Sequence, residues 1–311
     1  MKVGLTQMDI IWEDKQKNMD KARRLMGEAA KQNVDLLVFP EMTLTGFTMN
    51  TSLAGEEMLF SPTLRFFKDC SKEFGMAIAF GYVENFGQEY YNKLMIVSEG
   101  KVIFDYDKIH PFNFGEEGQH YIGGHEVKLA NFKDMVVSGF VCYDLRFPEI
   151  FQAVSNGAQL ILVIANWPKE RVAQWEALLR ARAIENQCYI VGVNRVGKGN
   201  GLEYVESSML FDPLGERLTK AHSKAELQVV EHTHNGAGEE GKALGVIACA
   251  VNRTVTATKV IVIVDEVDLH RVSPVQQLHH AHILLPPAQI HLEMGHAFGS
   301  VSGIFLDLLN V

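Results

Sequence analysis

The feature of this sequence that most restricts its fold is a regular alternation of short apolar runs with amphipathic helical patterns. The apolar run Val3 to Met8 is followed by a helical pattern over Lys15 to Gln32 and by a second apolar run, Val34 to Phe39. Apolar residues spaced three and four positions apart indicate a helix, and the flanking runs have the length of buried strands. The segment therefore predicts a strand–helix–strand unit.

The alternation continues as far as Asn194 and predicts an α/β fold. The expected elements are a helix from Pro62, a strand at Met76 to Val83, a hairpin of Asn92 to Ser98 and Lys101 to Asp107, a strand at Met135 to Val141, a helix at Pro148 to Ser155, a strand at Gln159 to Ile164, a helix at Glu170 to Asn186 and a strand at Cys188 to Asn194. Most of these strands are apolar without interruption, which is typical of a sheet covered on both faces.

Composition narrows the class of protein. The chain has 311 residues, of which 47% are hydrophobic and 22% charged, the balance of an ordinary globular protein. Its formal charge is −9, so the chain lacks the excess of basic residues that binding to nucleic acid requires. No apolar run approaches the roughly 18 residues of a membrane span, and the N-terminal segment reaches Asp9 before a signal-peptide core could form. We expect a soluble, cytoplasmic protein with no membrane or nucleic-acid partner.

Four cysteines are too few and too scattered for a disulfide scaffold, and none forms a C-x-x-C pair for zinc. Cys70 falls within a helical pattern, and Cys188 and Cys249 fall within apolar runs, so we expect these three in the core. Cys142 follows the end of an expected strand. It is the candidate nucleophile.

Three reactive side chains come directly after expected strands. Glu41 follows VDLLVFP, Lys108 follows VIFDYD, and Cys142 follows VVSGFV. The carboxyl ends of strands in an α/β sheet line its binding crevice, so residues distant in sequence can converge there. A packed cysteine and two solvated loop charges would explain the same placement without any chemistry.

If the three do converge, each has a chemical task. Cys142 lies where a strand turns into a helix, the setting of a nucleophile elbow. We expect this turn and a neighbouring Lys108 to lower the pKa of the thiol. Lys108 and the N–H of Tyr143 would stabilise an oxyanion, and Glu41 would accept a proton from the thiol or from water.

A papain-like pair of Cys142 with a histidine is the main competing interpretation. The available bases are His110, His120 and His125. His110 lies two positions beyond Lys108, so sequence position does not exclude it.

Residues 232–311 hold eight of the 12 histidines. His232 and His234, or His279, His280 and His282, are the candidate metal ligands. Their spacing lacks a matching set of cysteines or carboxylates, so we expect no metal site there.

Three longer segments surround the strand-end residues: LLVFPEMTLTGF, YDKIHPF and GFVCYDLRFPEIF, which contain Glu41, Lys108 and Cys142 respectively. In this order they are highly specific, and the chain resembles the nitrilase, or carbon–nitrogen hydrolase, superfamily. Similarity continues through NWPKERVAQWEALLRARAIENQCYIVGVNRVG and GLEYVESSMLFDPLGE, so it covers residues 1 to about 231.

The resemblance implies a four-layer α-β-β-α sandwich that forms homodimers or higher homo-oligomers through its outer helices. It also implies roles for the three residues: Glu41 as general base, Lys108 as oxyanion stabiliser, and Cys142 as the nucleophile that forms a thioester. In many members a second glutamate after the lysine helps to position substrate and water. Of Glu116 and Glu117 we prefer Glu117, from its spacing to Tyr121. No cofactor is implied.

The motifs CYDLRFPE and NWP resemble the omega-amidase-like branch, which implies hydrolysis of a small ω-amide of a dicarboxylate to the acid and ammonia. Tyr143 stands where nitrile-specific members carry Trp. Arg146 is a candidate for binding the substrate's free carboxylate, with a structural ion pair as the alternative. We expect Asn166 and Trp167 to shape the pocket wall.

Other activities remain open. The same thioester chemistry would serve a nitrilase, an N-carbamoyl amide hydrolase or an acyltransferase, and a non-catalytic interaction subunit would keep the fold alone.

The C-terminal region departs from the pattern of the superfamily. The expected last strand, AELQVVE, lies at residues 225–231, but the segment VDLHRV that should follow it closely appears only at 267–272. We therefore expect one catalytic domain over residues 1–272 with an atypical segment at about 232–259, and an extension at 273–311. Two strands are expected near 246–251 and 255–264.

Overall fold

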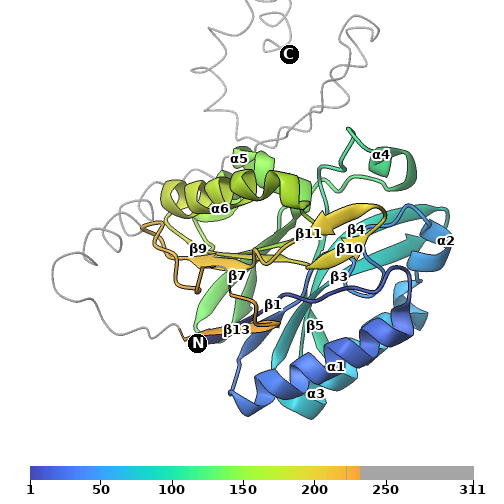
Figure 1. The fold of residues 1–311 in the computed structure, drawn as a ribbon, viewed down its shortest axis with the longest axis horizontal. Coiled ribbons are helices and arrows are strands. Elements are labelled where there is room, and N and C mark those ends of the chain that lie inside the picture. Colours follow the sequence, from blue (N-terminus) through green and yellow to red (C-terminus); the bar gives the residue numbers. More distant parts are fainter. Residues whose placement is uncertain (222, 232–311) are drawn as a thin grey trace, which may run out of the picture. The chain divides into compact units, whose positions relative to one another are not determined.

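Two β-sheets form the centre of the fold in the computed structural model, which describes residues 1–221 and 223–231 (Figure 1). The strands of the first sheet are, in spatial order, β13 (Leu227–Glu231), β1 (Lys2–Thr6), β2 (Leu36–Val38), β3 (Ala77–Phe86), β4 (Glu89–Ser98) and β5 (Lys101–Asp107). Those of the second sheet are β12 (Met209–Phe211), β9 (Tyr189–Asn194), β8 (Leu160–Ala165), β7 (Met135–Val141) and β6 (Ala130–Phe132). A hairpin of β10 (Gly197–Gly199) and β11 (Leu202–Tyr204) stands apart from both.

Long helices cover the outer face of each sheet (Figure 1). The first sheet carries α1 (Lys15–Lys31) and α3 (Pro62–Phe74), and the second carries α5 (Pro148–Ser155) and α6 (Val172–Asn186). Shorter helices lie in the connections: α2 (Thr51–Ala54), α4 (Glu117–His120) and the 3₁₀ turns η1 (Met58–Phe60), η2 (Cys142–Arg146) and η3 (Lys169–Arg171). The order of layers is helix, sheet, sheet, helix, so the predicted α-β-β-α sandwich is confirmed.

The two largest clusters of buried apolar residues lie on opposite faces of the first sheet, which is therefore buried on both faces. Alternate residues such as Leu5, Val38 and Leu94 pack against the second sheet, while Leu37 and Phe80 point to the other side, against α1 and α3. This explains why the strands are apolar without interruption. The two sheets meet so closely that a Cβ at Gly139 of β7 would lie 2.2 Å from the Leu94 side chain of β4.

Parallel pairing brings several strand ends to one edge of the molecule. Strands β1, β2 and β3 run parallel to one another, and so do β7, β8 and β9. The residues that follow β2, β5, β7 and β8 are therefore candidates for one shared site.

Most predicted elements are confirmed, with small shifts at their ends. The helix Pro148–Ser155 and the strand Met135–Val141 have the predicted bounds. The helix expected from Glu170 is divided, because the turn η3 at Lys169–Arg171 precedes α6. The strand expected over Val34 to Phe39 is shorter, because the N–H of Val34 instead bonds the Ala29 carbonyl at the end of α1.

Several predictions lie outside the described residues: the strands near 246–251 and 255–264, the location of Cys249, and the arrangement of residues 232–311. Within 1–221 and 223–231, no helix has the length and apolar character needed to cross a bilayer.

Candidate active site

A tight turn after β2 carries Glu41 into the interior. Met42 has φ +44°, and a Cβ at Gly81 of the neighbouring strand β3 would lie 2.1 Å from the Met42 nitrogen. The Thr43 hydroxyl donates to the Pro40 carbonyl at 2.6 Å and accepts from the Gly81 N–H at 2.9 Å. Glycine at 81 is thus the residue that lets β3 approach the turn and fix Glu41 in place.

The Glu41 carboxylate is fully buried and is held by donors from three other segments. Its Oε1 accepts from Lys108 Nζ at 3.1 Å and from Asn92 Nδ2 at 2.8 Å. Its Oε2 accepts from the backbone N–H of Asn166 at 2.9 Å. A carboxylate with this many donors has one orientation, which a proton acceptor needs.

Lys108 lies between Glu41 and a second buried carboxylate. Its Nζ is 2.8 Å from Glu117 Oε2 and 3.0 Å from Oε1, and Asn92 Nδ2 also donates to Glu117 Oε1, at 2.9 Å. Of the two glutamates considered from the sequence, Glu117 is buried and bonded to the lysine, whereas Glu116 is exposed.

The charges around Lys108 are unbalanced. Burial alone would lower the pKa of the Lys108 amine, but Glu117 and Glu41 raise it above its usual value, so the amine is charged. Burial raises the pKa of Glu117. Lys108 lowers this pKa and the Glu41 charge raises it, and the net shift is upward. One cation shared by two carboxylates leaves negative charge in excess, which favours uptake of a proton at the site.

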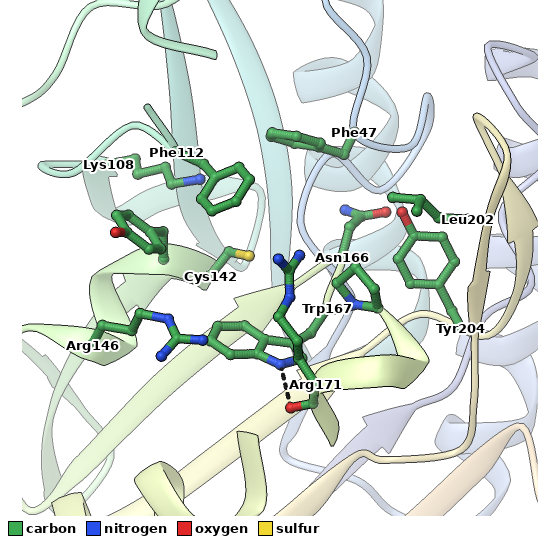
Figure 2. A pocket seen from close by; sticks show the side chains of 12 residues that line it. Phe47, Lys108, Phe112, Cys142, Arg146, Asn166, Trp167, Arg171, Leu202 and Tyr204 are labelled. Atoms are coloured by element: carbon green, nitrogen blue, oxygen red, sulfur yellow. Dashed lines mark hydrogen bonds between the residues drawn. The ribbon is translucent and has the colours of Figure 1, made fainter. Parts of the chain in front are cut away.

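Cys142 sits at the sharp turn between β7 and η2 with φ +49°, a left-handed conformation that is uncommon outside glycine. This conformation costs roughly 1–3 kcal/mol of stability at a non-glycine residue, and it is kept only where the surrounding structure imposes it. The expected strand-to-helix elbow is therefore present, and its thiol opens into a cavity (Figure 2).

The low thiol pKa expected from this turn is wrong. Burial raises the pKa of the Cys142 thiol well above its usual value, the Glu41 carboxylate raises it further, and Lys108 offsets only part of this. The resting sulfur is protonated, so a base must remove its proton as it attacks.

The cavity beside Cys142 has a volume of about 80 Å³. Figure 2 shows that its walls come from several connections rather than from one element. Four residues predicted to contact substrate line it: Tyr143, Arg146, Asn166 and Trp167. Lys108 lines it as well, whereas Glu41 and Glu117 lie behind it and are bonded to Lys108.

Asn166 connects the cavity wall to the base. Its Nδ2 donates to the Glu41 carbonyl at 2.7 Å. The next residue, Trp167, donates its backbone N–H to Asn194 Oδ1 at 2.7 Å and its Nε1 to the Arg171 carbonyl at 2.8 Å. The wall is therefore a hydrogen-bonded extension of the strand ends.

The structural ion pair considered for Arg146 is absent from the described part of the chain, where no carboxylate contacts its guanidinium. The group donates to Gln174 Oε1 at 2.7 Å and lies 5.2 Å from the centre of the Trp167 ring. Its charge is thus held at the cavity by a neutral side chain and an aromatic face.

The papain-like alternative does not fit the geometry. His110 is buried and stacked on Phe147, with ring centroids 3.6 Å apart, and its Nδ1 is 2.9 Å from Asp144 Oδ1. His120 and His125 are exposed. None of the three lines the cavity with Cys142.

The sequence interpretation missed several contributors to the site, among them Asn92, Phe47 and Arg171. Asn92 connects both glutamates, and Phe47 and Arg171 line the cavity. Arg171 could have been found from the sequence, because it lies four residues after Trp167, which is expected in the pocket wall. Asn92 gave no signal, since it begins an apolar run that the sequence assigns only to a strand.

Together, the two-sheet sandwich and a cysteine beside a buried lysine and glutamate define a class of hydrolase. The family described as carbon-nitrogen hydrolase matches residues 2–239. The chain belongs to this family, and the resemblance seen in its sequence is confirmed.

Individual proteins of the family show which members the chain is similar to. The chain is 36% identical over 217 residues to an omega-amidase, YafV, from Yersinia enterocolitica, covering 70% of this chain and 83% of that protein. It is 32% identical to a 2-oxoglutaramate amidase from Bacillus subtilis, covering 70% and 85%. Among solved structures, a carbon–nitrogen hydrolase superfamily protein from Xanthomonas campestris with an arsenic adduct in its active site superposes with a TM-score of 0.71 at 30% identity, covering 81% and 93%.

Proposed function

We propose that this carbon–nitrogen hydrolase is an omega-amidase, which hydrolyses a small ω-amide of a dicarboxylate to the acid and ammonia. The observation that carries the proposal is the cluster of Glu41, Lys108 and Cys142 around one small cavity that also has a cationic side chain, Arg146, in its wall. The names of the relatives from Yersinia enterocolitica and Bacillus subtilis agree with this substrate class.

In the first half of the reaction, Glu41 accepts the thiol proton as Cys142 Sγ attacks the amide carbonyl carbon. The oxyanion that forms is stabilised by Lys108 Nζ and by the N–H of Tyr143. The protonated Glu41 then gives its proton to the amide nitrogen, the C–N bond breaks, and ammonia leaves. The product on the enzyme is a thioester at Cys142.

In the second half, a water molecule attacks the thioester and Glu41 accepts its proton. The C–S bond breaks, the acid leaves, and the proton returns to the sulfur. Glu117 holds no reacting atom in this scheme; it orients Lys108 through the bonds of 2.8 and 3.0 Å. No cofactor takes part in either half.

Ammonia release from succinamate and 2-oxoglutaramate tests the proposal. Wild-type protein should turn over at least one of them and Cys142→Ala neither, and intact mass during turnover should show an acyl adduct only on wild type. Cys70→Ala, in α3 away from the cavity, is the matched control and should keep activity. Equal ammonia release by wild type and Cys142→Ala would refute the proposal.

A panel of substrates separates this activity from its neighbours in the family. Nitriles, N-carbamoyl amides, and acyl acceptors supplied with an amide donor should react at least tenfold more slowly than the ω-amides. Faster turnover of any of these would move the protein to that branch. A chain that turned over none of them and formed no adduct would be a non-catalytic subunit.

The assembly and location of the protein are part of the proposal. Homodimerisation through the outer helices is supported by Ile184 of α6, an apolar residue that is 51% exposed and lies next to Gly215. The cytoplasm is supported by free thiols at Cys70, Cys142 and Cys188. Light scattering of wild type and Ile184→Glu tests the first point.

We also keep residues 1–272 as the proposed catalytic domain and 273–311 as an extension. The family match, which ends at residue 239, supports a boundary after the described residues. Every residue given a role in the proposed reaction lies within residues 1–231.

A further inference from the structure

Three cationic side chains line the cavity, and they differ in what neutralises them. Lys108 contacts two carboxylates, and Arg146 donates to Gln174. Arg171, in η3, has no hydrogen bond or ion pair from its guanidinium to any residue in 1–221 or 223–231; it lies 5.3 Å from the centre of the Phe112 ring. As far as the described part of the chain goes, its five N–H donors are free to meet a ligand.

The backbone of Arg171 is held in place, although its guanidinium has no ionic partner among the described residues. Its carbonyl accepts the Trp167 Nε1 hydrogen bond at 2.8 Å, and the same Trp167 ring supports the Arg146 guanidinium from 5.2 Å. Both arginines are thus held against aromatic faces, which support a guanidinium while leaving its edge free for a planar acceptor.

The Arg171 guanidinium shares the cavity with the reacting sulfur. Figure 2 shows it extending from the η3 backbone into the group of lining side chains that includes Cys142. Tyr204 lines the same cavity, and burial raises the pKa of its hydroxyl to about 12. Arg171 and the sulfur that attacks substrate therefore line one cavity.

Within residues 1–221 and 223–231, neither the Arg146 nor the Arg171 guanidinium has a carboxylate partner, although the formal charge of the chain is −9. A guanidinium stays charged in proteins, so each can pair with an anion. The chemical group that fits is a small carboxylate, which an arginine edge binds through two parallel hydrogen bonds.

We infer that Arg171 binds the free carboxylate of the substrate and thereby selects amides with an anionic far end over neutral amides. This inference rests on the proposed amidase function and adds to it a second cation, from a segment different from that of Arg146. Arg171 acts as a specificity-determining residue and takes no part in proton transfer.

The test compares succinamate with succinamide, a neutral amide of nearly the same shape. Arg171→Ala should lower kcat/KM for succinamate by about 10- to 100-fold, mainly through KM, and change that for succinamide by less than about 2-fold. Arg171→Lys should restore part of the loss. Arg180→Ala is the matched control: Arg180 also lies over an aromatic ring, that of Phe211 at 5.3 Å, but it does not line the cavity.

Equal losses on both amides, or no loss on succinamate, would overturn the inference. A binding measurement keeps the inference separate from the proposed function. Succinate should bind Cys142→Ala at least 10-fold more tightly than it binds the Cys142→Ala, Arg171→Ala double variant, by calorimetry. If wild type hydrolyses neither amide but this difference is found, the activity is wrong and the carboxylate site stands. If succinate binds both variants equally, the carboxylate site is wrong.

Discussion

Asp144 Oδ1 accepts two hydrogen bonds from His110, one from its backbone N–H and one from its ring Nδ1, each at 2.9 Å. Asp144 Oδ2 accepts from the Tyr106 hydroxyl at 2.9 Å and from the Val141 N–H at 3.1 Å. One buried carboxylate thus fixes the end of β5, which carries Lys108, against the turn that holds Cys142 in its left-handed conformation.

Asp144→Ala should therefore lower the free energy of unfolding by about 3 kcal/mol, because it leaves several buried donors without an acceptor. It should also reduce kcat at least 10-fold by releasing the Cys142 turn. Urea denaturation and steady-state kinetics measure both effects. Asp134→Ala, at an exposed position, should change neither, and an Asp144→Ala protein of normal stability would contradict the role given to this carboxylate.

Asn92→Asp should lower kcat by roughly 100-fold with little change in volume. Asn92 Nδ2 donates to both Glu41 and Glu117, and an aspartate there would replace these two bonds with repulsion between carboxylates. A further carboxylate should add to the causes that raise the pKa of Glu117, so the pH profile of kcat should change. An unchanged profile would show that the amide does not control the base.

Glu41→Gln should abolish turnover and yet make the thiol more acidic. The Glu41 charge is one of the causes that raise the pKa of Cys142, and Lys108, which lowers it, would remain. The alkylation rate of Cys142 against pH, followed by intact mass, should therefore shift to lower pH in Glu41→Gln. A shift to higher pH would mean that Glu41 activates the resting thiol.

Gly81→Ala should destabilise the protein by about 3 kcal/mol or more, since even a smaller misfit in a packed core costs 1–3 kcal/mol and the new Cβ would lie 2.1 Å from the Met42 nitrogen. Because the turn it displaces carries Glu41, activity should fall along with stability. Gly27→Ala in α1 is the control: its Cβ would meet only Phe74, at 3.9 Å, so a gain of up to about 1 kcal/mol is expected. Thermal and urea unfolding of both variants decide between these outcomes.

The sequence located the three strand-end residues because apolar runs end where buried strands end. Glu41, Lys108 and Cys142 could be found this way, and the motifs around Cys142 indicated the family. Asn92 could not, because its contacts depend on the pairing of β4 with β3 and β5, which a single strand pattern does not record.

The thiol pKa was missed for a related reason. A strand-to-helix turn and a neighbouring lysine argue for a thiolate, but the outcome depends on how deeply the sulfur is buried and on the distance to Glu41. Neither can be read from the position of Cys142 in the chain. The partner of Arg146 was also unpredictable, because Gln174 comes from the first turn of α6.

The pairing of β1 with β13 sets an order for assembly of the chain on the ribosome. Lys2 lies opposite Glu231, so the first strand synthesised gains its outer neighbour only after residue 231 has emerged. Within residues 1–221 and 223–231, the last strand of the second sheet ends at Phe211. Until then one edge of β1 presents unpaired backbone groups to other nascent chains, so slow translation between residues 211 and 231 should favour aggregation.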